Sequence, residues 1–475
     1  GVRESEIAAE MIYRGRKLGA DREAFEPIVA SGWRSALPHG ISSNKKLEFG
    51  DMVVIDFGFV VEGYPSDITR TIAIGEPDKR MKSAYETVRR ASALAIYSSG
   101  IYLGSGLGLG LGGLIVDRWD LAWAGAVPPF GLRGWQVAFM VVGLPGVLLA
   151  LWVRTLREPV RGQLDGGPAA VPHPHPWREF GRELMAVLPP LTLFNLWLRR
   201  GRTRVLATNL AAATTAVALG VAMTRWLGNP QQWIALGVGL YAAFSWAQGL
   251  RLRDRPSFAL IFGTRSLHAS NLTFALLSFT GYSYGFWIAP YLMRTHGATT
   301  GQTGLVLGGM YALSGWLGTT FGGLLADRLL RRSPAGRLRV AMIAATLPVP
   351  FAVALLYAPS LTVAYALCFP LFLTTSLWLG PGASTVQDLV LPRMRAQASA
   401  MYLLVVTFIG LALGPYTVGR LSVALGGLRP ALLWALLANA LALLCALYAA
   451  RHIARDQETR GARAEAAGEP APGSG

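Results

Sequence analysis

Two aspartates, Asp56 and Asp67, have the spacing of a carboxylate pair on a β-hairpin. They lie in β-rich runs on either side of a turn at Glu62 and Gly63. If the hairpin pivots near Val61 and Glu62, the aspartates sit roughly opposite each other, and directly opposed residues share a face with Cβ atoms about 5 Å apart. Carboxylates that close repel unless protonated or bridged by cations, and two metal ions held about 3.5–4 Å apart would satisfy both. The alternative, that one aspartate caps a turn and the pair never meets, stays open on spacing alone.

The elements that would position this pair belong to a charged, alternating α/β segment over residues 1–90. SEIAAEMIYRGRKLGA predicts an amphipathic helix closed by Gly19, and FEPIVASG predicts a short strand that enters a loop. The hairpin strands are predicted over residues 51–60 and 67–74. Across residues 85–113 the chain changes to the composition of membrane helices. The change is abrupt and favours a splice of two truncated coding sequences near Ala91 over a regulatory linker.

The stretches FEPIVASGWRSALPHG and DMVVIDFGFVVEGYPSDITRT together resemble the pita-bread metallopeptidases over residues 4–90. They most resemble the Xaa-Pro aminopeptidase and prolidase type. This resemblance implies that Asp56 and Asp67 are metal ligands and that His39 is a catalytic residue on the substrate side. It also implies that a completed site would hold two divalent ions of manganese, cobalt or zinc.

The same resemblance calls for a further histidine and two glutamates from later strands. None of the histidines after residue 90 has a strand-like soluble context; they are His173, His175, His268, His296 and His452. Two aspartates alone are a poor dinuclear site, because catalytic metal sites need a fixed set of ligands. We therefore expect an inactive fragment with an exposed core face, and the sequence leans against an enzyme.

The composition points to a membrane protein. Of the 475 residues, 52% are hydrophobic and only 15% are charged, against about 25% charge in soluble domains. The net charge of +17 indicates basic cytoplasmic loops. A nucleic-acid partner is not expected, because the chain has no basic run interleaved with aromatic residues. Cys368 and Cys445 lie in apolar runs, which predicts buried small side chains instead of a disulfide or a zinc site.

Ten apolar runs are long enough to cross a bilayer, which takes about 20 residues. They are 94–116, 135–155, 204–224, 231–249, 272–294, 303–326, 338–358, 361–384, 398–423 and 430–450. If each run spans once, the main arginine groups all fall on one side. The positive-inside rule then places residues 1–90 and the C-terminal tail in the cytoplasm, with the chain in the inner (plasma) membrane.

The loop GGLLADRLLRRSPAGRLRV carries a specific signature. Its residues reproduce the G-x3-D-R-x2-R-R loop of the major facilitator superfamily, and they are Gly323, Asp327, Arg328, Arg331 and Arg332. We expect the glycine to permit close helix approach, the aspartate to pair with cations or helix termini, and the arginines to anchor the cytoplasmic face.

Three further stretches, among them GIYLGSGLGLGLGG, resemble the spinster-like branch of that superfamily over residues 92–455. The resemblance implies a mainly α, multi-pass bundle of about ten spans behind the partial α/β fragment. In family terms, residues 91–160 match helices five and six and residues 268–455 match the C-terminal six-helix half. Residues 161–267 then form a cytoplasmic loop with two inserted helices, helices one to four are missing, and residues 456–475 are a disordered tail.

Polar and aromatic positions within the predicted helices are candidates for lining a transport cavity, because polar groups in a membrane tend to be functional. The candidates are Asn271, Tyr282, Tyr284, Trp287, Gln387 and Asp388. The aromatic residues could equally be packing residues, and Asp388 could only cap a helix end. The glycines of the G-x-G-x-x-G match at 108–113 are interpreted as helix-packing residues, since no strand precedes them.

Three hypotheses follow. The first is transmembrane transport of a small solute, an amphiphilic one among the candidates, by a secondary transporter that needs no cofactor and is impaired by loss of its first four helices. The second is a metal-dependent Xaa-Pro aminopeptidase or prolidase-type hydrolase in the N-terminal segment. The third is a chimera with neither activity. The bilayer and the solute are the expected partners, and the sequence does not fix the oligomeric state.

Overall fold

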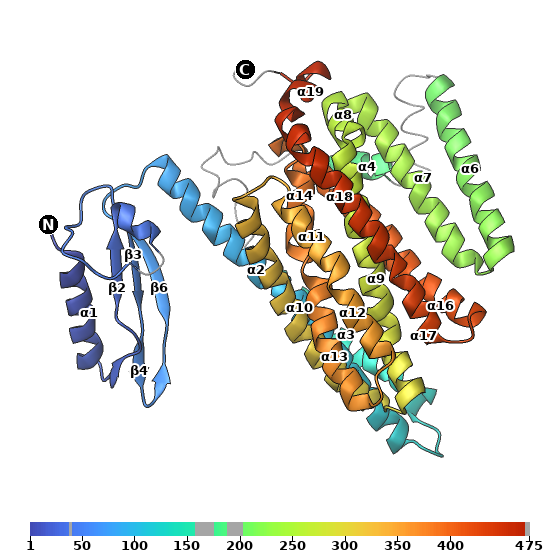
Figure 1. Ribbon diagram of the computed structural model, residues 1–475, viewed down its shortest axis with the longest axis horizontal. Helices are drawn as coiled ribbons and strands as arrows, with labels where there is room; N and C mark the ends of the chain where they lie inside the picture. The colour runs from blue at the N-terminus through green and yellow to red at the C-terminus, as the bar shows by residue number, and fades with distance from the viewer. Residues whose placement is uncertain (38–39, 157–174, 188–202, 471–475) are drawn as a thin grey trace. The chain divides into compact units, whose positions relative to one another are not determined.

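The chain folds into two compact units, one formed around residues 1–98 and one from residue 99 onward. The computed structural model describes residues 1–37, 40–156, 175–187 and 203–470 (Figure 1). Helix α2 (Lys79–Ala122) runs through the boundary between the units.

The first unit packs one helix against antiparallel strands. Helix α1 (Glu4–Lys17) lies on β2 (Ile28–Ser31), where Ala8, Val29 and Val53 form a small buried core. The two three-stranded sheets have the strand orders β1-β4-β5 and β2-β3-β6. The remaining elements of this unit are β1 (Arg22–Glu23), 3-10 helix η1 (Gly32–Ala36), β3 (Met52–Phe57), β4 (Phe59–Val61), β5 (Tyr64–Pro65) and β6 (Ile68–Ala73).

The predicted hairpin forms, with a two-residue turn. Glu62 and Gly63 have φ values of 51° and 84°, the backbone that a type I′ hairpin turn requires. In the resulting register Asp56 pairs with Thr69. Asp67 therefore lies two positions away from the residue opposite Asp56. The aspartates, expected roughly opposite each other, lie diagonally on one face, because the turn pivots between Glu62 and Gly63 and not near Val61 and Glu62.

The second unit is helical. Its helices before the C-terminal bundle are α3 (Gly134–Val153), α4 (Pro176–Val187), α6 (Thr203–Leu227), α7 (Pro230–Arg253) and α8 (Arg255–Gly263), with 3-10 helix η2 (Pro129–Gly131). The bundle contains α9 (Arg265–His296), α10 (Thr300–Leu330), α11 (Gly336–Thr346), α12 (Pro348–Leu356), α13 (Leu361–Ser376), α14 (Leu379–Gln387), α15 (Arg395–Val405), α16 (Gly414–Ala424), α17 (Leu428–Ala435), α18 (Leu437–Glu458) and α19 (Arg460–Ala466). A 3-10 turn, η4 (Pro392–Met394), precedes α15, and a π-helix, η5 (Val406–Leu413), joins α15 to α16.

The mainly α prediction is confirmed, and each of the ten predicted apolar runs lies on helix. Within the described residues, six helical segments are long and apolar enough to cross a membrane. They are Gly134–Val153, Val205–Leu227, Gly336–Leu356, Leu361–Gln387, Pro392–Ala424 and Leu428–Glu458. The other four predicted runs lie on α2, α7, α9 and α10, which are long helices richer in glycine and polar residues.

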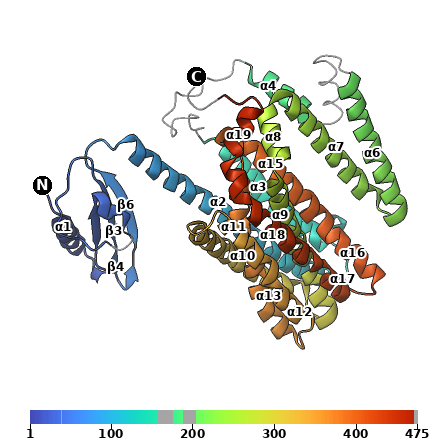
Figure 2. The ribbon, with the colours of Figure 1, turned by 45° about the horizontal axis from the view of Figure 1, so that its top comes forward.

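Helix α9 lies at the centre of the bundle. It packs along α18, η5 and α16, and its residues enter both large apolar clusters of the second unit. Phe274 belongs to the cluster shared with α11, α14 and α18, and Tyr284 belongs to the cluster shared with α12, α13 and α17. Helices α6 and α7 pair with each other at the side of this bundle (Figures 1 and 2). Only 6% of the apolar span of α6 is buried, which leaves most of its surface for lipid.

The prediction of a disordered tail over residues 456–475 was wrong for the described part of that segment. Helix α18 continues to Glu458, and α19 follows over Arg460–Ala466. Ala464 is fully buried, since α19 packs against α8. Alanine and arginine favour helix, and contacts with distant residues hold the segment in place. Residues 471–475 lie outside the described residues.

Candidate functional site

Glycines bring α2 and α10 into close contact. A Cβ atom at Gly308 would lie 2.5 Å from the carbonyl oxygen of Gly106, and one at Gly304 would lie 2.7 Å from that of Leu109. A Cβ at Gly113 would lie 2.9 Å from the carbonyl oxygen of Thr300. Small residues of this kind let helix backbones approach in a membrane. Of the three glycines interpreted as packing residues, Gly110 and Gly113 lie against α10, whereas a Cβ at Gly108 would meet nothing within 4 Å.

A carboxylate fixes one end of this contact. Asp117, one turn beyond Gly113 on α2, accepts a hydrogen bond of 2.5 Å from the backbone N–H of Gly301 in the first turn of α10. The first four N–H groups of a helix have no partner within the helix, and the helix dipole favours negative charge there. Asp117 therefore satisfies an N–H group of α10 and ties it to α2.

Asn271 and Ser278, seven residues apart on one face of α9, form a short polar line. Within the described residues, the side chains of Asn271, Ser270, Ser278 and Ser283 have buried polar atoms without a hydrogen-bond partner. Asn271 is only 2% exposed, and both its amide nitrogen and its amide oxygen are unpaired. Buried polar groups without partners are costly, so these side chains are the places on α9 that most need a polar partner.

Glycines bring η5 and the start of α16 into close contact with α9. A Cβ at Gly410 would lie 2.7 Å from Cβ of Ser278, and one at Gly414 would lie 3.0 Å from Oγ of Ser283. A run of π-helix inside an α-helix is uncommon and often marks a functional position. The polar line on α9 and the irregular helix beside it are therefore the strongest structural candidates for a solute contact.

Two of the aromatic cavity candidates on α9 form hydrogen bonds that join α9 to neighbouring helices. Tyr284 is 1% exposed, and its hydroxyl donates to the backbone oxygen of Leu432 on α17 at 3.1 Å. The indole nitrogen of Trp287 donates to the backbone oxygen of Pro415 on α16 at 2.8 Å. Tyr282 is 38% exposed. A role of these three residues in lining a cavity stays a prediction.

Gln387 and Asp388 lie at the end of α14, where the side chain of Gln387 donates to Oγ of Ser399 at 2.9 Å. Asp388 forms an ion pair with Arg337 of α11, and its backbone oxygen accepts a hydrogen bond from Arg460 of α19. The contacts of Asp388 join the ends of three helices, which fits a bracing residue.

The signature loop places its charges at the surface. Asp327, Arg328, Arg331 and Arg332 are exposed, and no ion pair to them is seen among the described residues. The expectation for Gly323 was wrong, because a Cβ there would meet nothing within 4 Å. Its neighbour Gly322 makes the close approach instead, with its missing Cβ directed at the backbone of Leu377.

Arg393 connects three segments at one end of the second unit. Its guanidinium pairs with Asp254, between α7 and α8, at 2.8 Å, and it also pairs with Glu469 beyond α19. Partial burial raises the pKa of Asp254, but hydrogen bonds from Arg393 and Ser257 outweigh it and hold that pKa at about 2. The hydrogen bond from Arg393 also lowers the pKa of Glu469.

Two more contacts fasten the same C-terminal segment. Asp456 accepts a hydrogen bond of 2.5 Å from Oγ of Ser266 at the start of α9. Arg463 donates to Oγ1 of Thr264 at 2.9 Å. Together with the Arg393 pairs, they hold residues 456–469 against the start of α9 and the α7–α8 junction.

In the first unit, the carboxylate pair does not assemble a metal site from the described residues. Oδ1 of Asp56 accepts a hydrogen bond of 2.7 Å from Oγ1 of Thr69, and Asp67 is exposed. No group of three or more His, Cys, Asp or Glu residues in the described part of the chain could hold a metal ion. His39 lies outside the described residues. The described residues therefore do not fit a pair of divalent ions.

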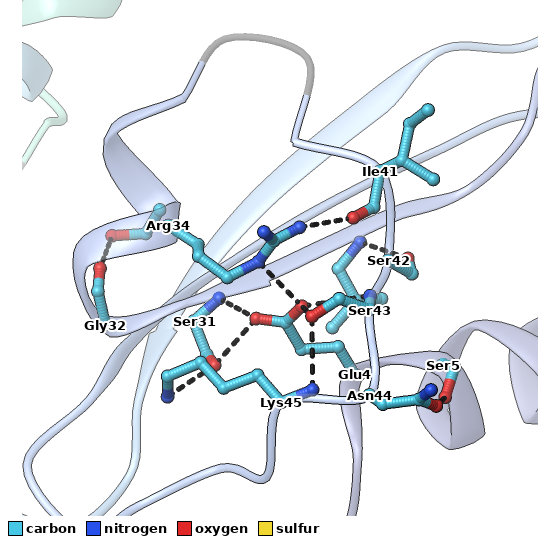
Figure 3. Close-up of polar contacts among 12 residues, drawn as sticks. Glu4, Ser5, Ser31, Gly32, Arg34, Ile41, Ser42, Ser43, Asn44 and Lys45 are labelled. Carbon is cyan, nitrogen blue, oxygen red and sulfur yellow. Dashed lines mark hydrogen bonds and ion pairs between the residues drawn. The ribbon is translucent and has the colours of Figure 1, made fainter.

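Glu4 holds together the loops beside β2 in the first unit (Figure 3). Its side chain is fully buried, with Oε1 accepting from the backbone N–H and the hydroxyl of Ser31 at 2.7 and 2.8 Å. Oε2 accepts from the backbone N–H and the hydroxyl of Ser43 at 3.1 and 2.7 Å and from Nε of Arg34 at 3.1 Å. The five hydrogen bonds fix α1 to the two segments that flank residues 38–39.

Comparison with known proteins finds matches to two families along the chain. The model of the Major Facilitator Superfamily matches residues 81–415. The solved structure of a bacterial homologue of the human lysosomal transporter Spinster, in an inward-facing and unoccupied conformation, is similar with a TM-score of 0.51. The match has 20% identity and covers 77% of this chain and 72% of that chain, so it shows the fold. The recognition of a spinster-like fold in this superfamily is confirmed.

The N-terminal match is to part of a peptidase. The model of metallopeptidase family M24 matches residues 1–100. The Xaa-Pro dipeptidase of Pyrococcus horikoshii is 48% identical over 99 residues, which cover 21% of this chain and 28% of that protein. The Xaa-Pro dipeptidase of Pyrococcus furiosus is 49% identical over 96 residues, with 20% and 28% covered. The chain thus spans just over a quarter of the length of these curated relatives.

Sequence reasoning missed several residues that the structure brings into contact. Asp117 had a signal, because Gly113-Leu-Ile-Val-Asp117-Arg118 repeats the order of Gly323-Leu-Leu-Ala-Asp327-Arg328. Glu4 opens a helix, where acidic residues are common, so nothing local marked its burial. The partners of Arg393 are 139 and 76 residues away and carry no local signal.

Proposed function

Because this chain belongs to the Major Facilitator Superfamily, we propose that its helical unit is a multi-pass secondary transporter for a small amphiphilic solute. The observation that carries the proposal is the line of unpartnered polar groups on α9 beside the π-helix η5. A polar group of the solute would pair with Asn271, and the apolar part would lie against the surrounding helices. We expect a low rate if the peptidase-like unit takes the place of the family's first four helices, as the sequence resemblance implies.

The transport test uses the full chain reconstituted into liposomes, with ethidium and 8-anilinonaphthalene sulfonate as amphiphilic probes of opposite charge. Protein-dependent movement of either probe is expected, and Asn271→Ala should reduce it. Leu272→Ala is the matched control, since Leu272 is the next residue on α9 and is 39% exposed. Equal rates in protein-free liposomes, or equal losses in the two variants, would contradict the proposal.

The orientation can be tested separately. The proposed location is the inner (plasma) membrane with both the N-terminal unit and the C-terminal segment in the cytoplasm. A cysteine at Gly461, where a side chain meets nothing within 4 Å, gives an accessible label on α19. A membrane-impermeant maleimide should label this cysteine in inverted membrane vesicles and not in intact cells. Labelling in intact cells would show that α19 lies outside the cell, which contradicts the proposed orientation.

A second candidate function is metal-dependent hydrolysis of Xaa-Pro dipeptides by the N-terminal unit. It is favoured by the identity with Xaa-Pro dipeptidases and by the placement of Asp56 and Asp67 on one face. Cleavage of an Xaa-Pro dipeptide after addition of manganese or cobalt, lost in Asp56→Asn, would support it. No cleavage is the result we expect, because the described residues supply no third ligand. If neither transport nor cleavage is measured, the chain is an inactive chimera.

A further inference from the structure

A cavity of about 820 Å³ opens between α6, α7, α8 and the residues that end α19. It lies outside the polar line on α9 and outside the peptidase-like unit. Two arginines, Arg251 at the end of α7 and Arg255 at the start of α8, line it. Its other walls are largely apolar and include Leu252, Phe258 and Ala259.

The two arginines supply positive charge that no acid in the described part of the chain neutralises. Arg251 lies over the ring of Phe258 at 5.6 Å, which fixes its direction. Neither arginine forms an ion pair among the described residues. Asp254, which lies between them in sequence, is held by Arg393 at 2.8 Å instead. The cavity therefore presents two guanidinium groups to whatever enters it.

The polar side chain of Gln248, which also lines the cavity, already has hydrogen-bond partners within the protein. The amide nitrogen of Gln248 donates to the backbone oxygen of Val205 at 3.1 Å and to Oγ1 of Thr208 at 2.7 Å, and its oxygen accepts from Asn209 at 2.6 Å. Gln248 thus joins α6 to α7 where it lines the cavity. An occupant is recognised by the arginines on one side and by apolar contact on the other.

The cavity lies where an apolar span meets polar chain. Val205 begins the span Val205–Leu227, of which only 6% is buried, so the adjoining surface of α6 faces lipid. Leu252 is 46% exposed at the same end of α7. Basic pockets between membrane helices at this depth bind anionic lipid headgroups. A soluble anion would gain nothing from the apolar walls.

We propose that this cavity binds the headgroup of an anionic phospholipid. The phosphate lies between Arg251 and Arg255, and the glycerol and first acyl carbons lie against Leu252 and Phe258. Guanidinium groups suit this role because their fixed N–H donors match phosphate oxygens. Ala466 and Ala467 close the cavity from the C-terminal segment, so bound lipid also contacts the residues that follow α19.

The test measures binding of short-chain phosphatidylglycerol, short-chain phosphatidylcholine and inorganic phosphate to the purified full chain. Phosphatidylglycerol should bind more tightly than the other two. The double variant Arg251→Gln, Arg255→Gln should weaken that binding at least about tenfold, because hydrogen bonds to a charged group are lost. The double variant Arg339→Gln, Arg451→Gln is the matched control, since it removes the same charge at exposed positions outside the cavity.

A second variant, Ala259→Phe, keeps both arginines and fills the cavity, and it should weaken lipid binding as well. Retained helix content by circular dichroism identifies variants that fold. Equal binding of phosphatidylcholine, an equal loss in the control variant, or unchanged binding in Arg251→Gln, Arg255→Gln would each overturn the proposal. If inorganic phosphate binds as tightly as the lipid and displaces it, the site takes free phosphate and the lipid assignment is wrong.

Discussion

Asp117 and Gly301, 184 residues apart in the chain, are joined by a hydrogen bond of 2.5 Å between a carboxylate and a backbone N–H. The bond ties the end of the glycine-rich helix α2 to the first turn of α10. Replacing Asp117 by Asn removes the charge that the helix N-terminus favours, with an expected loss of stability of about 1 kcal/mol. The measurement is the unfolding midpoint of the purified chain in detergent. Asp327→Asn, at an exposed position of the equivalent sequence pattern, should leave the midpoint unchanged.

The glycine contact between α2 and α10 can be tested with adjacent residues. Gly308→Val places a side chain against the backbone oxygen of Gly106, so the helices must separate. Overpacking of this kind costs about 1–3 kcal/mol. Gly309→Val is the control, because a Cβ at that position meets nothing within 4 Å. A similar loss of unfolding free energy in the two variants would mean that helix propensity, and not the contact with α2, causes the destabilisation.

The ion pairs of Arg393 predict how the C-terminal segment is protected. In Arg393→Gln both Asp254 and Glu469 lose their cation, so α19 should detach more often. Trypsin should then cleave after Arg460 or Arg463 several-fold faster than in the unchanged chain. Arg395→Gln removes an equal charge two residues away and should leave the cleavage rate unaltered.

The same pairs predict a dependence on pH. The pKa of Asp254 in the folded chain is about 2, below the value of about 3.9 expected for an unfolded chain. Its stabilising contribution is therefore complete above about pH 4 and is lost as the pH falls through about 2. A spin label at Gly461→Cys, with the two natural cysteines replaced, should become mobile over that range. In Asp254→Asn the label should already be more mobile at neutral pH, and a label equally immobile at pH 2 and pH 7 would contradict this account.

In the first unit, Glu4→Gln tests the buried carboxylate. The substitution leaves Arg34 without its partner and turns an amide nitrogen toward groups that donate, which should cost about 3 kcal/mol. Hydrogen exchange of the backbone amides in β2, measured in the full chain, should become faster. Glu10→Gln is the control on the same helix, because Glu10 makes only an exposed pair with Arg14.

Much of the architecture could be predicted because the signals are local. Apolar runs marked helices, and the turn at Glu62 and Gly63 marked a hairpin. The register of that hairpin depends on where the two-residue turn pivots, and a shift of one residue in the pivot moves each pairing by two. For this reason the aspartates were expected opposite each other and lie diagonally instead.

The errors at Gly323 and in the C-terminal segment have a different cause. Which glycine of a Gly-Gly pair faces the neighbouring helix is set by the rotation of α10, and Gly322 has that direction. The order of residues 456–469 depends on partners such as Arg393 and Ser266, which are distant in sequence. The composition of this segment, polar and rich in alanine and glycine, indicates disorder. The residues that hold it in place become its neighbours only when the chain folds. The cavity-lining roles of Asn271 and its neighbours stay predictions.

The π-helix η5 has a mechanical meaning for the helix that follows it. An α-helix turns by about 100° for each residue, and i→i+5 bonding accommodates one residue more than α-helical bonding does. If η5 returned to α-helical bonding, α16 would swivel by about 100° about its axis. Gly414 would then leave Phe279 and Ser283, and Gly419 would leave Trp287, which are close approaches of α16 to α9. The eight residues of η5 therefore set the rotation at which α16 meets α9.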